Sequence, residues 1–232
     1  KGYGIVNYDS NFKMVGDEAM QLFERFKNRF VIGVCEDRVF GAKKIIEDMD
    51  LDVLLLDDSY QHRRIKPGFN ILLTDYNDPY FKDFVLPAGN LRESRRGAKR
   101  ADIIVVTKCP ENITEEKKQF YISRIKPRYY QKVFFSTINY DEEIFCFDPK
   151  LKLPDNNMSY YDILLITGIA NPKTFVEEVK RYSSNVKHLR FKDHHSFTTE
   201  DISLIKKEYE KLGEYKLILT TEKDYVRLKG FD

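Results

Sequence analysis

The sequence predicts an α/β protein with a doubly wound, mostly parallel sheet and a second, smaller α/β domain. Apolar runs without polar alternation, such as Val53–Leu56 and Ile103–Val106, are typical of strands buried on both faces of a parallel sheet. Helical segments lie between these runs, and this alternation indicates parallel pairing with right-handed crossovers. The polar stretch DPKLKLPDNN at 148–157 contains two prolines and predicts a boundary between the domains.

The expected first domain spans residues 1–148. Within it, Asp17 and Glu18 fall in the first turn of a helix, where carboxylates favour the positive helix end, so helix capping is one interpretation of both. We expect short strands at Tyr3–Tyr8 and Phe30–Val34, further strands at Val53–Leu56, Asn70–Asp75, Ile103–Thr107 and Lys132–Phe135, and helices at about Gly16–Lys27, Val39–Met49 and Glu115–Ile125.

The expected second domain spans residues 149–232, with a hinge near 149–160. Thr198 or Thr199 with a following acid predicts a helix cap. We expect strands at Ile163–Thr167, Val186–Phe191 and Lys216–Thr220, and helices at Pro172–Tyr182 and Thr199–Lys211.

Composition restricts the class of protein. Hydrophobic residues make up 42% of the 232 positions and charged residues 33%, which is typical of a globular chain and excludes a disordered one. There is no apolar run of about 18 residues that could cross a membrane. The three cysteines lack metal or disulfide spacing and are expected to be reduced. We expect no nucleic-acid partner, and no protein partner is evident.

Two adjacent acids follow the predicted strand Val53–Leu56. Ligands of open α/β sheets bind outside the carboxyl ends of the strands. Asp57 and Asp58 occupy such a position, and carboxylate oxygens are what a nucleotide-bound Mg²⁺ prefers. A solvated turn is the alternative interpretation of this pair.

Basic side chains and histidines lie at other strand ends. Arg38, Arg92 and the pairs at 63–64 and 95–96 suit bidentate phosphate contacts, although the second pair could also belong to a solvated helix face. For His194 and His195, a carboxylate–imidazole pair fits better than zinc, because no further His or Cys lies at ligand spacing. The chain contains no GxxxxGK[ST] phosphate loop.

Seven blocks taken together resemble one family, the tetraacyldisaccharide 4′-kinases of lipid A biosynthesis. The blocks are VGDEA (15–19), EDR (36–38), DDSYQHRR (57–64), LPAGNLRE (86–93), GIANP (168–172), KDHHSF (192–197) and TTEKDYVRL (220–228). The resemblance implies a P-loop-kinase-like core that transfers the γ-phosphate of ATP, with Mg²⁺, to the 4′-hydroxyl of a tetraacylated glucosamine disaccharide 1-phosphate.

The resemblance also implies where the protein works. Its partners would be the lipid disaccharide and a membrane surface, at the cytoplasmic face of the bacterial inner membrane. The family pattern places an N-terminal helix and the P-loop before Lys1, so we expect the given chain to be inactive by itself.

Roles for individual residues follow from the same resemblance. Asp17 resembles the base that takes the proton of the attacking hydroxyl, and His194 resembles the histidine that pairs with it across a domain interface. Hinge closure would then be a condition of catalysis. Asp57 and Asp58 correspond to Walker-B-like acids near Mg²⁺. Substrate or phosphate contacts are expected from Glu18, Arg38, Gln61, His62, Arg92 and Asp193. Ser59 departs from the pattern, where glycine is common.

Two other functions remain open at this point. A non-catalytic nucleotide-binding module could keep the fold without a P-loop. A metal-dependent hydrolase could use Asp57, Asp58, His194 and His195.

Overall fold

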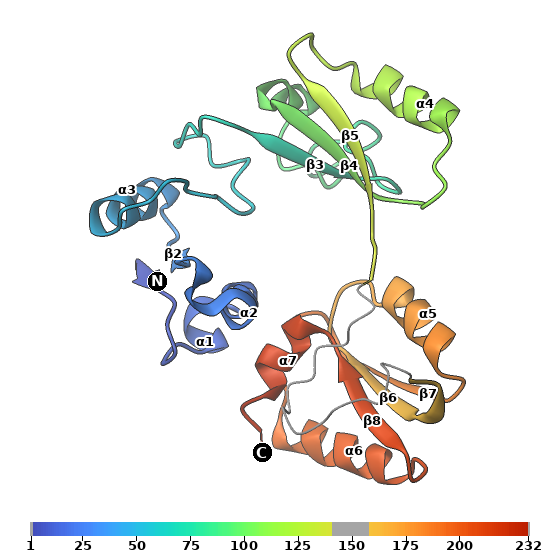
Figure 1. The fold of residues 1–232 in the computed structure, drawn as a ribbon. Helices are drawn as coiled ribbons and strands as arrows, with labels where there is room; N and C mark the ends of the chain where they lie inside the picture. The colour runs from blue at the N-terminus through green and yellow to red at the C-terminus, as the bar shows by residue number, and fades with distance from the viewer. Residues whose placement is uncertain (1, 141–157, 232) are drawn as a thin grey trace. The chain divides into compact units, whose positions relative to one another are not determined.

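The computed structural model describes residues 2–140 and 158–231 (Figure 1). The chain divides into two compact units: unit 1 comprises residues 1–36 with 142–232, and unit 2 comprises residues 37–141. This grouping differs from the expected division at 148/149 because residues 1–36 group with the C-terminal part. The expected hinge near 149–160 falls largely on 149–157, outside the described residues. None of the helices in the described part has the length and apolar character that a membrane crossing requires.

The sheet of unit 1 is parallel, and its central strand is the most deeply buried element. Strands β7 (Val186–Arg190), β6 (Asp162–Thr167) and β8 (Lys216–Thr220) pair in that order. Alternate β6 residues face opposite sides: Ile163 packs with Val179 of α5 (Lys173–Tyr182), and Leu164 packs with Ile205 of α6 (Thr199–Glu210). The apolar run that predicted this strand is therefore covered on both faces.

The N-terminal segment completes unit 1. It contains β1 (Gly4–Ile5), α1 (Phe12–Val15), α2 (Asp17–Phe26), the 3₁₀ turn η1 (Lys27–Arg29) and β2 (Gly33–Val34), with β1 and β2 antiparallel. Met20 and Phe23 of α2 form a buried cluster with Val226 of α7 (Glu222–Leu228). This packing holds the start of α2 beside the start of α7. A further 3₁₀ turn, η4, spans Met158–Tyr160.

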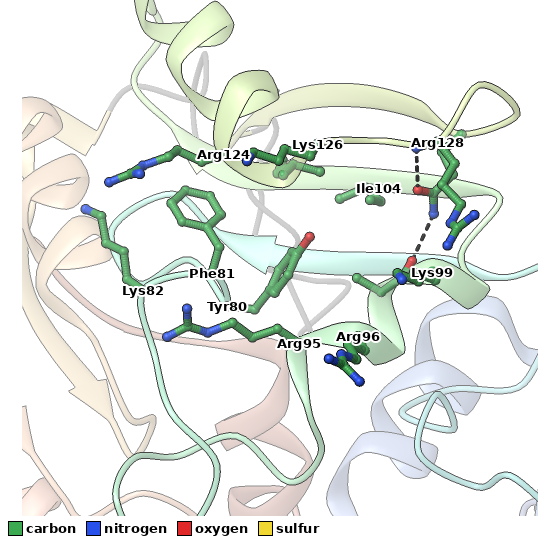
Figure 2. A pocket seen from close by; sticks show the side chains of 13 residues that line it. Tyr80, Phe81, Lys82, Arg95, Arg96, Lys99, Ile104, Arg124, Lys126 and Arg128 are labelled. Carbon is green, nitrogen blue, oxygen red and sulfur yellow. Dashed lines mark hydrogen bonds between the residues drawn. The ribbon is translucent and has the colours of Figure 1, made fainter.

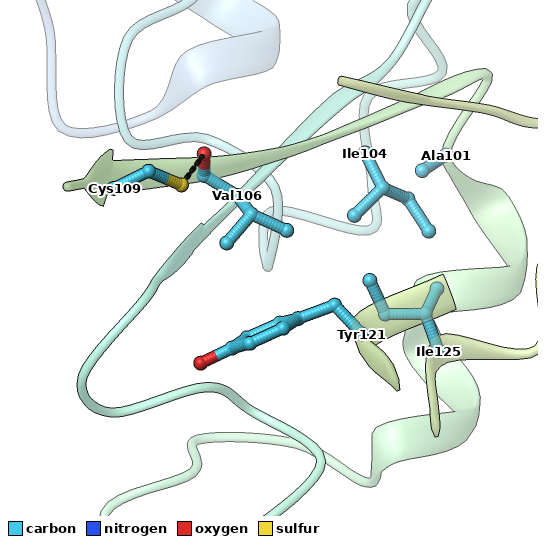
Figure 3. Close-up of a cluster of buried hydrophobic side chains, with 6 residues drawn as sticks. All are labelled: Ala101, Ile104, Val106, Cys109, Tyr121 and Ile125. Carbon is cyan, nitrogen blue, oxygen red and sulfur yellow. Dashed lines mark hydrogen bonds between the residues drawn. The ribbon is translucent and has the colours of Figure 1, made fainter. Parts of the chain in front are cut away.

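Unit 2 contains a second parallel sheet, with strand order β3–β4–β5. A core of Ala101, Ile104, Val106, Cys109, Tyr121 and Ile125 joins β4 to the adjacent helix (Figure 3). The elements are α3 (Arg38–Asp48), β3 (Ile71–Asp75), η2 (Arg95–Arg100), β4 (Ile103–Cys109), α4 (Glu115–Ile125) and β5 (Lys132–Thr137). In both units the expected α/β class with parallel pairing is confirmed.

One expected strand is wrong. Residues 53–56 form no strand, and the side chains of Val53 and Leu55 are 71% and 87% exposed. A strand that is buried on both faces needs neighbouring strands and covering helices, and among the described residues no strand pairs with this run. The expected strands at 3–8 and 30–34 are also shorter than predicted, at two residues each.

Candidate active site

Asp17 is the first residue of α2, and the local backbone presents its carboxylate at the helix start. Gly16 precedes it with φ of 96°, a conformation that glycine adopts without a steric penalty. Asp17 Oδ1 accepts the Glu18 amide at 3.1 Å, and the Asp17 side chain is 14% exposed. The packing of α2 on α7 fixes this position.

His194 meets Asp17 directly. Its backbone is left-handed, with φ of 54°, and its amide donates to the Gly168 carbonyl at 3.1 Å. His194 Nδ1 lies 2.9 Å from Asp17 Oδ2. Both residues belong to unit 1, and the expectation that they pair across a domain interface stays a prediction.

Two cations beside this pair have no role in the sequence-based prediction. Lys223 Nζ lies 3.1 Å from Glu18 Oε1 and 3.4 Å from His194 Nε2. Arg227 Nε lies 3.7 Å from Asp17 Oδ2, and its side chain is only 2% exposed. Both residues lie within the sequence block TTEKDYVRL. A helical sequence pattern does not distinguish a cation that contacts the site from a cation on the solvent-exposed surface.

Arg227 belongs to a buried polar network below the Asp17–His194 pair. Its guanidinium donates to Asp224 Oδ1 at 2.6 Å and to the carbonyls of Gly168 and His195 at 3.2 and 3.1 Å. Asp224 is fully buried and also accepts the Gly168 amide at 2.9 Å. Buried charges persist when they are paired in this way. Since the Gly168 carbonyl also receives the His194 amide, the network positions His194.

His195 turns away from His194. Its Nε2 lies 2.8 Å from Asp201 Oδ2, and its ring contacts Phe191 and Phe197. Burial alone would raise the pKa of Asp201, but hydrogen bonds from His195 and Thr198 outweigh it and lower that pKa. Asp193 Oδ2 is 3.8 Å from His194 Nε2. Among residues 2–140 and 158–231, no three His, Cys, Asp or Glu side chains gather so as to hold a metal ion.

The acids of unit 2 lie in an exposed turn. Asp58 has φ of 40°, its amide donates to Asp57 Oδ1 at 3.0 Å, and its Oδ2 lies 3.5 Å from an Arg92 terminal nitrogen. Tyr60 anchors the turn, because its hydroxyl donates to the Gly97 carbonyl at 2.9 Å. Burial raises the pKa of Tyr60 to about 12. Two adjacent carboxylates fit Mg²⁺, which proteins bind through one or two carboxylates together with substrate phosphates.

The remaining predicted residues of unit 2 lie around this turn. Arg38 is the first residue of α3, behind the helix cap Asp37. The Phe40 amide is the main cause of a lowered pKa at Asp37, and Arg64 lies 3.2 Å from its carboxylate. Gln61 and His62 are exposed. The structure thus brings Arg92 to Asp58, and it brings neither Gln61 nor His62 into a buried site.

Comparisons with known proteins give one consistent result. The family described as tetraacyldisaccharide-1-P 4'-kinase matches residues 1–232. The chain is 42% identical to the tetraacyldisaccharide 4'-kinase of Flavobacterium johnsoniae, over 99% of this chain and 65% of that protein. It is 40% identical to the enzyme of the same name from Bacteroides thetaiotaomicron, over 98% of this chain and 63% of that protein.

A solved structure agrees with these relatives. The crystal structure of LpxK from Aquifex aeolicus in complex with ATP covers all of this chain with a TM-score of 0.67 and 26% identity, and 67% of that protein is matched. The chain spans about two thirds of the length of the curated relatives it matches.

Proposed function

Because the chain belongs to the tetraacyldisaccharide-1-P 4'-kinase family, we propose that the protein is an ATP-dependent lipid kinase. It transfers the γ-phosphate of ATP to the 4′-hydroxyl of a tetraacylated glucosamine disaccharide 1-phosphate. The family match confirms the resemblance that seven sequence blocks indicated. The observation that carries the proposed chemistry is the 2.9 Å contact between Asp17 and His194.

Asp17 is the proton acceptor in this proposal. A sugar hydroxyl is a weak nucleophile at neutral pH, so a positioned base accelerates its attack. Asp17 Oδ2 is engaged by His194 Nδ1, and Arg227 lies 3.7 Å from the same oxygen. Within the described part of the chain, Oδ1 accepts a hydrogen bond from the Glu18 amide alone, so Oδ1 is the oxygen that receives the hydroxyl proton. His194 then orients the carboxylate and stabilises its charge.

Positive charge surrounds this base. Lys223 bridges Glu18 and the second nitrogen of His194, and Arg227 holds the backbone that carries His194. Phosphoryl transfer depends mainly on positioning and on stabilising charge. We assign Lys223 and Arg227 as positioning residues, and Glu18 and Asp193 as residues that contact the substrate or its phosphate.

Asp57 and Asp58 are the residues that would hold Mg²⁺. When bound with ATP, Mg²⁺ neutralises charge on the β- and γ-phosphates. The two carboxylates lie in an exposed turn, where they are accessible to a nucleotide-bound cation. Arg92 lies beside Asp58 and suits a bidentate phosphate contact. Arg38, Gln61 and His62 are assigned to phosphate or substrate contacts on the family resemblance.

The proposed substrate also suggests where the enzyme works. A tetraacylated disaccharide resides in a lipid bilayer, so its headgroup is accessible only at a membrane surface. We therefore place the reaction at a membrane surface, on the cytoplasmic face of the bacterial inner membrane.

The test is phosphate transfer by the natural full-length protein, with Mg²⁺, ATP and tetraacyldisaccharide 1-phosphate. Asp17→Asn should lower kcat at least about a hundredfold, a typical effect of losing a general base. Asp9→Asn removes an exposed carboxylate elsewhere in unit 1 and should leave kcat unchanged. Wild-type turnover in Asp17→Asn would remove Asp17 from the mechanism. No transfer by the unmodified protein would favour a non-catalytic nucleotide-binding module instead.

A further inference from the structure

The proposed reaction gives no role to His195, although this residue directly follows His194. It also gives none to a cavity of about 800 Å³ in unit 2, which is lined by residues between Tyr80 and Gln131 (Figure 2). The cavity shares no residue with the Asp17–His194 pair, whereas His195 lies in the same loop as His194, between β7 and α6. The contacts of His195 therefore bear directly on how that pair is held.

His194 has a backbone conformation that its residue type does not favour. Its φ of 54° lies in the left-handed region, where a side chain approaches the neighbouring carbonyl. Such a conformation persists only where the surrounding structure enforces it. The imidazole of His194 is 54% exposed, so the packing of this ring supplies little of the restraint. The flanking residues of the loop must supply the rest.

The ring of His195 is tied to the core of unit 1. It stacks on the Phe191 ring with centroids 4.9 Å apart and meets the Phe197 ring edge-on at 5.1 Å. Phe197 is buried in a cluster with Leu164 of β6 and Ile205 of α6. These contacts hold the plane of the imidazole against a part of the molecule that does not move with the loop.

The polar end of the same ring is fixed to the start of α6. His195 Nε2 lies 2.8 Å from Asp201 Oδ2, and because a carboxylate only accepts, Nε2 donates. Asp201 is part of a capping box: its Oδ2 accepts the Thr198 amide at 2.9 Å, and its own amide donates to the Thr198 hydroxyl at 3.3 Å. The acceptor of the His195 hydrogen bond is thus itself held in place.

The backbone carries this restraint to His194. The His195 carbonyl accepts the Arg227 guanidinium at 3.1 Å, so both the side chain and the main chain of His195 are held. Adjacent residues share one planar peptide unit. With His195 directed at Asp201, the His194 ring is directed at Asp17, whose Oδ2 lies 2.9 Å from its Nδ1.

We propose that His195 and Asp201 form a positioning pair, which holds His194 Nδ1 against the carboxylate of Asp17. The pair differs from the buried Arg227–Asp224 network, which acts on the backbone of Gly168. Its effect on the rate of phosphate transfer rests on the proposed function. Its effect on the position of His194 does not, and that position can be measured without ATP or the acceptor lipid.

Two substitutions of His195 separate its hydrogen bond from its packing. His195→Leu keeps an apolar side chain against the two phenylalanine rings and loses the donor. His195→Gln keeps an amide donor at about the reach of Nε2. Thr198→Ala is the control, because it removes the hydroxyl from the capping box and weakens the start of α6 while His195 stays intact. All variants are made in the natural full-length protein.

The first measurement is NMR of ¹⁵N-labelled histidine side chains without nucleotide or acceptor. The ring resonances lost in His194→Ala identify His194. In His195→Leu, the Nδ1 resonance of His194 should move toward its position in Asp17→Ala, because the contact between the two residues is broken. In His195→Gln and in Thr198→Ala it should stay near its position in the unmodified protein. An unmoved His194 resonance in His195→Leu would overturn the proposal.

The second measurement is steady-state kinetics of phosphate transfer. His195→Leu should lower kcat about tenfold through misplacement of His194, with the KM for ATP unchanged, and His195→Gln should restore most of kcat. In a His194→Ala background, His195→Leu should have little further effect, because it acts through His194. Thr198→Ala should lower Tm and leave kcat nearly unchanged.

Two kinetic outcomes would also overturn the positioning role. One is a multiplicative loss in the double variant, and the other is an equal loss of kcat in His195→Leu and Thr198→Ala, which would assign His195 to the stability of the fold alone. A lack of transfer by the unmodified protein would instead contradict the kinase proposal. The histidine spectra would still decide whether His195 positions His194.

Discussion

Asp17 Oδ2 and His194 Nδ1 lie 2.9 Å apart although 177 positions separate the two residues in the chain. The resemblance of two sequence blocks, VGDEA and KDHHSF, to one family pointed to both residues. Those two blocks do not contain Arg227. Its side chain is only 2% exposed, and this burial places its charge beside Asp17. Burial of one charged side chain within a helical pattern depends on what the helix packs against. Periodicity alone does not contain that information.

The contact between Asp17 and His194 predicts that the two residues act as a unit. Asp17→Ala should lower kcat at least about a hundredfold. His194→Ala should lower kcat less, because it removes the orientation of the base and leaves the base itself. If the pair acts together, the double variant should be little worse than Asp17→Ala alone. Steady-state kinetics of the four proteins, with Mg²⁺-ATP and the lipid acceptor, would show this. Multiplicative losses would contradict the coupling.

Arg227 should contribute to the stability of the folded protein as well as to the position of His194. Arg227→Met leaves Asp224 buried without its ion-pair partner, which typically destabilises a protein by about 3–5 kcal/mol. Urea denaturation would measure the change in the free energy of unfolding. Arg25→Met is the matched control, because Arg25 forms an exposed ion pair with Glu222 and its loss should cost below about 1 kcal/mol. Equal losses in both variants would show that the buried network contributes no special stability.

At the level of elements, two apolar runs with the same pattern had opposite outcomes. Residues 163–166 form the buried centre of β6, with exposed fractions of 0% to 1%. Residues 53–56 are no strand, and Leu55 is 87% exposed. Both runs predict a strand covered on two faces. Only the first has neighbouring strands on both edges and helices on both faces, and such neighbours are a tertiary property that a local pattern does not specify.

Glu208 connects α6 to β7 and gives unit 1 a predicted pH dependence. Hydrogen bonds from Lys187 and Lys211 lower the pKa of Glu208 to about 2, from an ordinary 4.5. Because the folded-state pKa lies below the unfolded one, this stabilisation is complete above about pH 4.5 and is lost as the pH falls through about 2. Glu208→Gln should therefore lower Tm at pH 6 and have little effect near pH 2.

The control for this prediction lies two residues away in the sequence. Glu210 is exposed in the same helix, and Glu210→Gln should leave Tm nearly unchanged at both pH values. Thermal unfolding followed by circular dichroism would measure all three proteins. A Tm difference between Glu208→Gln and the unmodified chain that is as large at pH 2 as at pH 6 would contradict the assigned ion pairs.

At the scale of the whole molecule, the proposed roles are distributed over both compact units. Asp17 and His194 belong to unit 1, whereas Asp57 and Asp58 belong to unit 2. The sequence predicted one domain over residues 1–148. That division put Asp17 in the same domain as Asp57 and Asp58. The structure groups residues 1–36 with the C-terminal part because α2 packs on α7. Contacts over some 200 positions set that grouping, and no local composition signal marks them.

This separation predicts that the two acidic sites respond differently to the metal. Asp58→Ala should raise the Mg²⁺ concentration needed for half-maximal activity, because Mg²⁺ loses one carboxylate ligand, and saturating Mg²⁺ should restore part of kcat. Asp17→Asn should lower kcat at every Mg²⁺ concentration and leave the midpoint unchanged. Asp52→Ala removes an exposed carboxylate six positions before Asp58 and should alter neither quantity. Magnesium titrations of the natural full-length enzyme at fixed ATP would separate these cases. An unchanged midpoint in Asp58→Ala would remove that residue from the metal site, and proton transfer at Asp17 would remain as a separate assignment.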